Sequence, residues 1–197
     1  MKKRKPLFPL GHVVKYEAAV DIFAELEYPT PKLAALARRV VVEFKNVPYP
    51  GDDNIIDPAN WIKDYEYTTC QSLFTGRKWQ HVTRELMHDH SERIFWLSNV
   101  AMHYFMPAFL LSILTIDPHM EINFTVTCLL LPPFFELYKP KEFHALFSTF
   151  SRGEKLLIAD IFDALGEVIP EDLASSTQWH GDPPAWQITS AYYRDNA

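Results

Sequence analysis

The residues of this chain with the clearest potential for chemistry lie together in one short segment. His81, Glu85, His88 and Glu92 are spaced i, i+4, i+7 and i+11, so on one helix their side chains would share a face. Glu85 and His88 have the Glu-x-x-His spacing of carboxylate-bridged metal sites. The pattern therefore suggests a metal-dependent enzyme that uses His81, Glu85, His88 and the neighbouring His90.

The opposite interpretation is an exposed polar stripe. A di-metal bundle needs two Glu-x-x-His motifs and two more glutamates, and the sequence contains no second motif. On the helix expected over residues 79–90, Trp79, Val82 and Leu86 take the opposite side, which turns the His/Glu side toward water. His90 also points away from His88 at a spacing of i, i+2. We therefore expect a solvated stripe and predict no cofactor.

A second group of candidate residues is acidic and lies near the C-terminal end. Residues 160–197 hold seven carboxylates and a single base, Arg194, in a chain whose formal net charge is −6. Asp163, Glu167, Glu171 and Asp172 can complement a basic partner and steer its association. The alternative is that these charges only favour solubility. Nucleic acid is not an expected partner, because phosphate binding demands clustered Lys and Arg.

Familiar catalytic patterns are missing from the sequence. There is no Gly-x-Gly-x-x-Gly, P-loop, Gly-x-Ser-x-Gly or His-Glu-x-x-His motif, and the chain has only six glycines. Cys70 and Cys128 are single and far apart, so both are expected to be small core residues in a reducing cytoplasm. His103, in an apolar segment, is expected to be a buried histidine with a hydrogen-bond partner. These features favour a non-catalytic protein, although a pocket assembled from distant residues would leave no motif.

The elements that must position these residues are expected to be helices. With 48% hydrophobic and 22% charged residues, the chain can form one compact domain with a substantial core. A first amphipathic helix is predicted over residues 13–26. Thr30 can cap a second helix that has Pro31 at its first position and carries apolar residues at helical spacing as far as Phe44. A surface loop is expected over residues 47–54, where prolines, glycine and turn formers gather.

Further helices have recognisable start and stop signals. Asp57-Pro58 is a helix start, and Gly76 is a suitable left-handed C-cap for the helix that follows it. Ser98 can cap an apolar helix that runs to Ile116, with a kink expected at Pro107. That apolar run is too short to span a bilayer, so it is expected to be a core helix. Ser151 and Glu154 form a capping box for a last strong helix, which Gly166 is expected to end.

Together these signals predict an all-α fold, a compact single-domain bundle of about seven or eight helices. Residues 121–130 alternate apolar and polar side chains, so a short strand near that segment stays open as an alternative. Residues 1–12 are expected to be a flexible basic N-terminus and residues 13–197 a single helical domain. Within that domain, the aromatic residues of 170–197 suggest a docked C-terminal extension.

From about Phe44 to Phe162 the chain resembles a bacterial family of domains of unknown function, number six-seven-one-four. The most specific piece is Ser98 followed, six residues on, by Tyr104-x-x-Pro-Ala. The other residues that carry the likeness are Phe44, Pro48 to Pro50, Ser72 to Trp79, Leu86, Phe95 to Leu97, Phe105 to Leu110, Phe147, Phe150 and the segment from Glu154 to Phe162. The resemblance implies a small, mostly helical, soluble bacterial protein and transfers no catalytic or binding residue.

The expected function is that of a non-catalytic protein-binding module, such as an immunity or inhibitor protein that covers a basic toxin. It is based on the one-sided acidity and the missing motifs, and the toxin context is an analogy with other compact bacterial proteins. The competing expectation is the metal-dependent enzyme described above. A homodimer joined through the Pro107 helix or the C-terminal aromatic residues is a third alternative. No membrane association is expected.

Overall fold

The structure is a computed structural model, and it describes residues 28–57, 65–83, 86–87, 90–115, 126, 130, 132, 140–168 and 185–197. Within these residues there are six α-helices, three short 3₁₀ turns and no β-strand. The only extended pairing among them is an isolated bridge between Ile56 and Leu97. The predicted all-α fold is therefore confirmed. The helix expected over 13–26 lies outside the described residues, and so do residues 58–64, the first part of the helix expected from Pro58 to Gly76.

Helix α1 (Pro31–Glu43) begins as its sequence predicts. The Thr30 hydroxyl accepts a hydrogen bond from the Leu33 amide, at 3.2 Å, and Pro31 occupies the first turn. Leu33, Leu36, Ala37 and Val40 are buried and form the inner side of the helix, as their spacing requires.

The predicted loop over residues 47–54 contains one 3₁₀ turn (Asp52–Asn54) and is held by Tyr49. The Gly76 amide donates to the Tyr49 hydroxyl at 2.7 Å, and that hydroxyl donates in turn to Asp52. Burial and the bond to Asp52 raise the pKa of Tyr49 to about 12. Gly76 has a φ of 67° just after α2 (Tyr65–Phe74), which confirms the predicted left-handed C-cap.

The prediction of one continuous helix over residues 79–90 is wrong. Trp79–His81 form a 3₁₀ turn, and Val82 then adopts an extended conformation with φ −81° and ψ 103°. A second 3₁₀ turn covers Ser91–Trp96. The buried side chains of Trp79 and Val82 explain the break, because tertiary packing of both residues outweighs a weak local helix preference.

Helix α4 (Asn99–Ile113) is the central helix of the core. The Ser98 hydroxyl caps it by accepting from the Ala101 amide at 3.2 Å, as predicted, although the helix ends three residues before Ile116. Pro107 lies inside α4, and almost every residue from Ala101 to Ile113 is buried. Among the described residues, no helix is both long enough and apolar enough to cross a membrane.

Helix α7 (Arg152–Val168) begins with the predicted capping box. The Ser151 amide donates to Glu154 Oε2 at 2.6 Å, and the Glu154 amide donates to the Ser151 hydroxyl at 3.3 Å. Gly166 does not end the helix as expected, because α7 continues to Val168. Its small size serves packing instead, since a Cβ at this position would lie 2.4 Å from Cδ1 of Trp186 in helix α9 (Ala185–Asp195).

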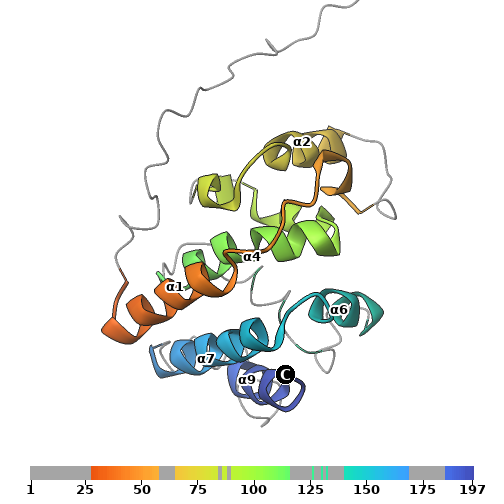
Figure 1. The fold of residues 1–197 in the computed structure, drawn as a ribbon. Coiled ribbons are helices and arrows are strands. Elements are labelled where there is room, and N and C mark those ends of the chain that lie inside the picture. Colours follow the sequence, from red (N-terminus) through yellow and green to blue (C-terminus); the bar gives the residue numbers. More distant parts are fainter. Residues whose placement is uncertain are drawn as a thin grey trace, which may run out of the picture.

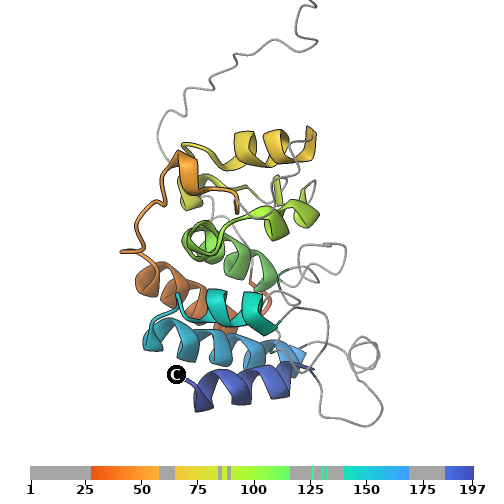
Figure 2. The ribbon, with the colours of Figure 1, turned by 90° about the vertical axis from the view of Figure 1, so that its right-hand side faces the viewer.

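The helices form stacked layers (Figures 1 and 2). Helix α7 lies between α1 and α9, and α4 lies between α2 and the layers formed by α1, α7 and α9. Helix α6 (Pro140–Phe147) packs against α4. All six helices contribute to one hydrophobic core, in which Phe44, Phe74, Phe105, Phe109 and Phe162 are among the largest buried side chains. In the segment 121–130, for which a short strand was the alternative prediction, only Val126 and Leu130 are described, and both are helical and buried.

Candidate functional site

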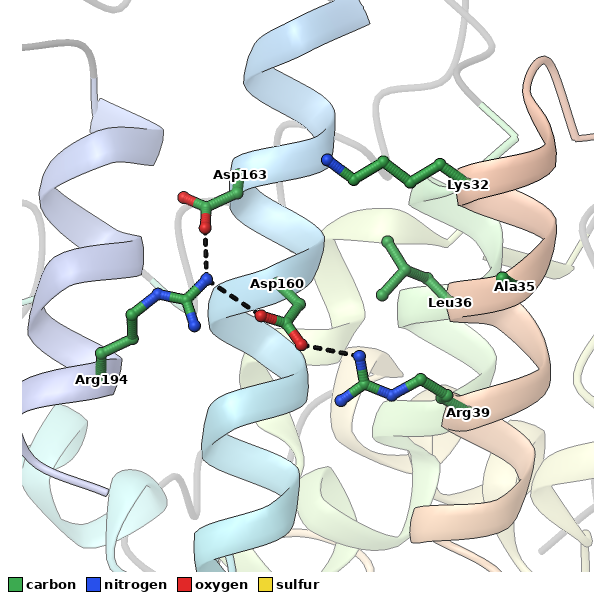
Figure 3. Close-up of a pocket in the computed structure, with 7 residues that line it drawn as sticks. All are labelled: Lys32, Ala35, Leu36, Arg39, Asp160, Asp163 and Arg194. Carbon is green, nitrogen blue, oxygen red and sulfur yellow. Dashed lines mark hydrogen bonds and ion pairs between the residues drawn. The ribbon is translucent and has the colours of Figure 1, made fainter.

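A groove between α1, α7 and α9 is the candidate site. It has a volume of about 380 Å³ and is open to solvent. Five of its seven lining residues are charged, and the other two, Ala35 and Leu36 of α1, are apolar (Figure 3). The complete lining is Lys32, Ala35, Leu36, Arg39, Asp160, Asp163 and Arg194.

Asp160 is the centre of the charged network in this groove. Its Oδ2 accepts from Nη1 of Arg39 on α1 at 2.6 Å, and its Oδ1 accepts from Nη2 of Arg194 on α9 at 2.9 Å (Figure 3). The same Nη2 also donates to Asp163. Burial alone would raise the pKa of Asp160, but the hydrogen bonds from Arg39 and Arg194 bring it below its usual value. Asp160 therefore links all three helices through one carboxylate.

The pair between Lys32 and Glu167 lies at the other end of the groove. Lys32 Nζ is 2.6 Å from Glu167 Oε1, and the side chains are 51% and 60% exposed. An ion pair with this much exposure contributes little net stability, because water screens it and both long side chains lose rotamer freedom. Lys32 and Glu167 can therefore separate at low cost.

The structure places two of the four predicted partner-binding acids on this side of the molecule. Asp163 and Glu167 both lie on α7, one turn apart, and each is engaged by a base of the same chain. The basic residues that neutralise this part of α7 come from α1 and α9, so the acid excess counted along the sequence is smaller on the folded surface. Glu171 and Asp172 lie outside the described residues.

The predicted metal-ligand face is not built on one helix. His81 belongs to the 3₁₀ turn that ends before Val82, so it does not continue into a helix carrying the later candidates. His90 precedes the next 3₁₀ turn, and its buried Nδ1 has no hydrogen-bond partner within the part of the chain that the structure describes. Glu85 and His88 lie outside the described residues. In the part of the chain that the structure describes, no three His, Cys, Asp or Glu residues are arranged to hold a metal ion.

A buried polar pair joins α4 to the first turn of α7. His103 Nε2 lies 3.0 Å from Glu154 Oε1, and the two side chains are 17% and 4% exposed. The rings of Phe44 and Phe150 meet the imidazole edge to face, with centroid distances of 5.9 and 5.2 Å. Burial tends to raise the pKa of Glu154, but hydrogen bonds from His103 and Ser151 lower it below its usual value. His103 is thus the partnered histidine that its apolar helix predicts, although it is only partly buried, and its partner is a carboxylate.

Sequence reasoning missed the links between helices that are distant in the chain. The capping box identified Glu154 but not its second bond to His103, and nothing local connects these residues. Asp160 was counted among the excess acids without a partner, although the i, i+7 spacing of Lys32 and Arg39 puts two bases on one face of α1. These two bases on one face of α1 could have indicated that a neighbouring helix presents acidic residues to it.

Comparison of the chain with protein-family models, with curated proteins and with solved structures finds no match.

Proposed function

We propose that this protein is a non-catalytic protein-binding module, such as an immunity or inhibitor protein for a basic toxin, and that the outer side of α7 contacts the partner. The observation that supports the proposal is the exposure of Asp163 and Glu167, whose side chains are 42% and 60% accessible while paired to bases that are themselves 41% and 51% accessible. A partner arginine or lysine can replace such an exposed base with little loss of folding free energy.

Helix α7 also holds the carboxylates of Asp163 and Glu167 on a well-packed element. Its inner side is buried through Leu157, Ile158, Ile161 and Phe162, and α9 packs along it through the contact of Trp186 with Gly166. Carboxylates held on a rigid helix need little further ordering when a partner binds, which lowers the entropic cost of association. Complementary charge on the partner would then set the rate and the register of binding.

The bacterial and cytoplasmic context belongs to the same proposal. It rests on the resemblance in the segment from Phe44 to Phe162 and on the wide separation of Cys70 and Cys128 in the sequence, which favours a reducing compartment. An immunity protein of this kind would act on its toxin inside the producing cell.

The test first isolates from the host any polypeptide that co-purifies with the protein, and then measures its binding at low and at moderate salt. We expect D163K together with E167K to weaken binding at least tenfold at low salt and to reduce the salt dependence, because two attractive charges become repulsive. Unchanged affinity in this double variant would rule out the outer side of α7 as the contact surface.

Asp53 provides a matched control. It is an exposed acid in the 3₁₀ turn Asp52–Asn54. The segment that contains this turn lies near α2 and away from α7 in both views of the fold (Figures 1 and 2). D53K changes the net charge in the same direction and should leave the affinity within about twofold, since a distant exposed charge is screened beyond a Debye length. An equal loss in D53K would assign the effect to net charge alone.

A further inference from the structure

We infer that the groove between α1 and α7 binds a small dicarboxylate, with Lys32 at one end of the ligand and Arg39 at the other. This inference does not rest on the proposed protein partner, because the ligand contacts are the bases of α1, although both proposals require the exposed pair between Lys32 and Glu167 to open.

The spacing of the basic residues sets the class of ligand. Lys32 and Arg39 are seven residues apart on α1, so their Cα atoms are separated by about 10 Å along the helix axis. Both side chains extend from α1 toward α7, on either side of Leu36 (Figure 3). Between them, Ala35 and Leu36 line the groove with apolar groups. Two cationic ends with an apolar centre fit two carboxylates joined by a short hydrocarbon chain.

The unused hydrogen-bond donors of the groove favour an anion over a cation. Three bases, Lys32, Arg39 and Arg194, line the groove with the acids Asp160 and Asp163, and a third acid, Glu167, pairs with Lys32 beside it, so the number of charges alone does not decide. Both oxygens of Asp160 are already engaged, whereas Arg39 uses only Nη1 in its bond to Asp160. A guanidinium has five N–H donors in a planar fork, so Arg39 retains donors for a second carboxylate.

Lys32 becomes available by exchange of its partner. Its bond to Glu167 is exposed on both sides, so replacing one carboxylate by another changes the folding free energy little. A dicarboxylate would bind more tightly than an anion with one carboxylate, since its second carboxylate binds Arg39 at the same time. A monocarboxylate cannot make both contacts.

The experiment is a titration of the ¹⁵N-labelled full chain with glutarate, followed by amide chemical shifts in NMR spectra. We expect saturable shifts confined to the amides of α1 and of α7 near Asp160. Butyrate should bind at least tenfold more weakly, because it lacks the second charged contact. Cadaverine, a diamine of similar length, should shift none of these amides. Saturable binding of cadaverine at the groove, equal affinity for butyrate, or no saturable shifts with glutarate would overturn the inference.

Two variants and a control locate the ligand. K32Q should weaken glutarate binding about tenfold by removing one charge-assisted contact. A35D places a negative charge at an exposed position of the groove and should abolish binding without disturbing the core. R38Q removes a base from the neighbouring exposed position, which does not line the groove, and should bind as the parent protein does. Equal loss in R38Q, or full binding by A35D, would contradict the assignment.

Discussion

Helix α7 carries glutamates in two contrasting environments. Glu154, in its first turn, is 4% exposed and bonds to both Ser151 and His103, whereas Glu167, near its end, is 60% exposed and, among the described residues, bonds to Lys32. In the first environment a carboxylate without its partners would be a buried charge with a large desolvation penalty. In the second environment, water solvates the carboxylate when its partner is removed. Burial, more than the number of ion pairs, therefore decides which of these charged residues stabilise the fold and which are available to bind a ligand.

The strongest way to break this contrast is to remove Glu154. Glu154→Ala leaves the Ser151 amide and the largely buried His103 ring without their acceptor, so we expect the free energy of unfolding to fall by about 3 kcal/mol in chemical denaturation. Glu167→Gln, the exposed counterpart, should change it by less than about 0.5 kcal/mol. Equal effects of the two changes would show that burial does not govern these contacts.

The two glycines of α7 offer a second comparison. A Cβ on Gly166 would lie 2.4 Å from the Trp186 ring, so Gly166→Ala should cost about 2 kcal/mol through overpacking against α9. A Cβ on Gly153 would lie 2.7 Å from Oε2 of Glu43, an exposed carboxylate that can rotate away. Gly153→Ala should therefore be neutral or slightly stabilising in thermal unfolding, since alanine favours a helix over glycine. The opposite order would mean that α9 is not tightly docked.

Acid titration should also distinguish the two environments. The pKa of Glu154 is lower in the folded protein than its ordinary value, so the stability it contributes is present above about pH 4.3 and is lost as the pH falls through the folded value. Chemical denaturation between about pH 5 and pH 3 should show a shallower decline in Glu154→Gln than in the parent protein. Asp160 acts with the same sign, so part of the decline should remain. An unchanged slope would refute the role of Glu154.

The smallest expected effect on stability is that of Lys32. Lys32→Gln removes only the exposed pair with Glu167, so the midpoint of thermal unfolding should stay within about 2 °C of the parent value. A large drop would show that this pair supports the fold, and it would then be unsuited to exchange with a ligand or a partner.

Local signals in the sequence predicted local structure well. Thr30, Ser98 and the Ser151–Glu154 box all start helices where expected, because a cap involves only residues within one turn. The expectation failed over 79–90, where burial of Trp79 and Val82 overrides local preference, and at Gly166, which makes room for Trp186 instead of ending the helix.

Most of the candidate site was not predictable in the same way. Asp163 and Glu167 were singled out by their charge, but the bases that meet them come from α1 and α9, and only the packing of the three helices brings them together. The bond between His103 and Glu154 likewise joins residues with no local relation. Side-chain type indicated that each needs a partner, but the identity of that partner is a property of the tertiary fold.

The most direct test of the proposed function is the native mass spectrum of the untagged protein purified from its own host, recorded beside the D163K and E167K double variant. The account predicts a complex with a second, basic polypeptide for the parent protein and the loss of that complex in the variant. A bare chain in both spectra, or a complex that survives the charge reversal, would contradict binding through the outer side of α7.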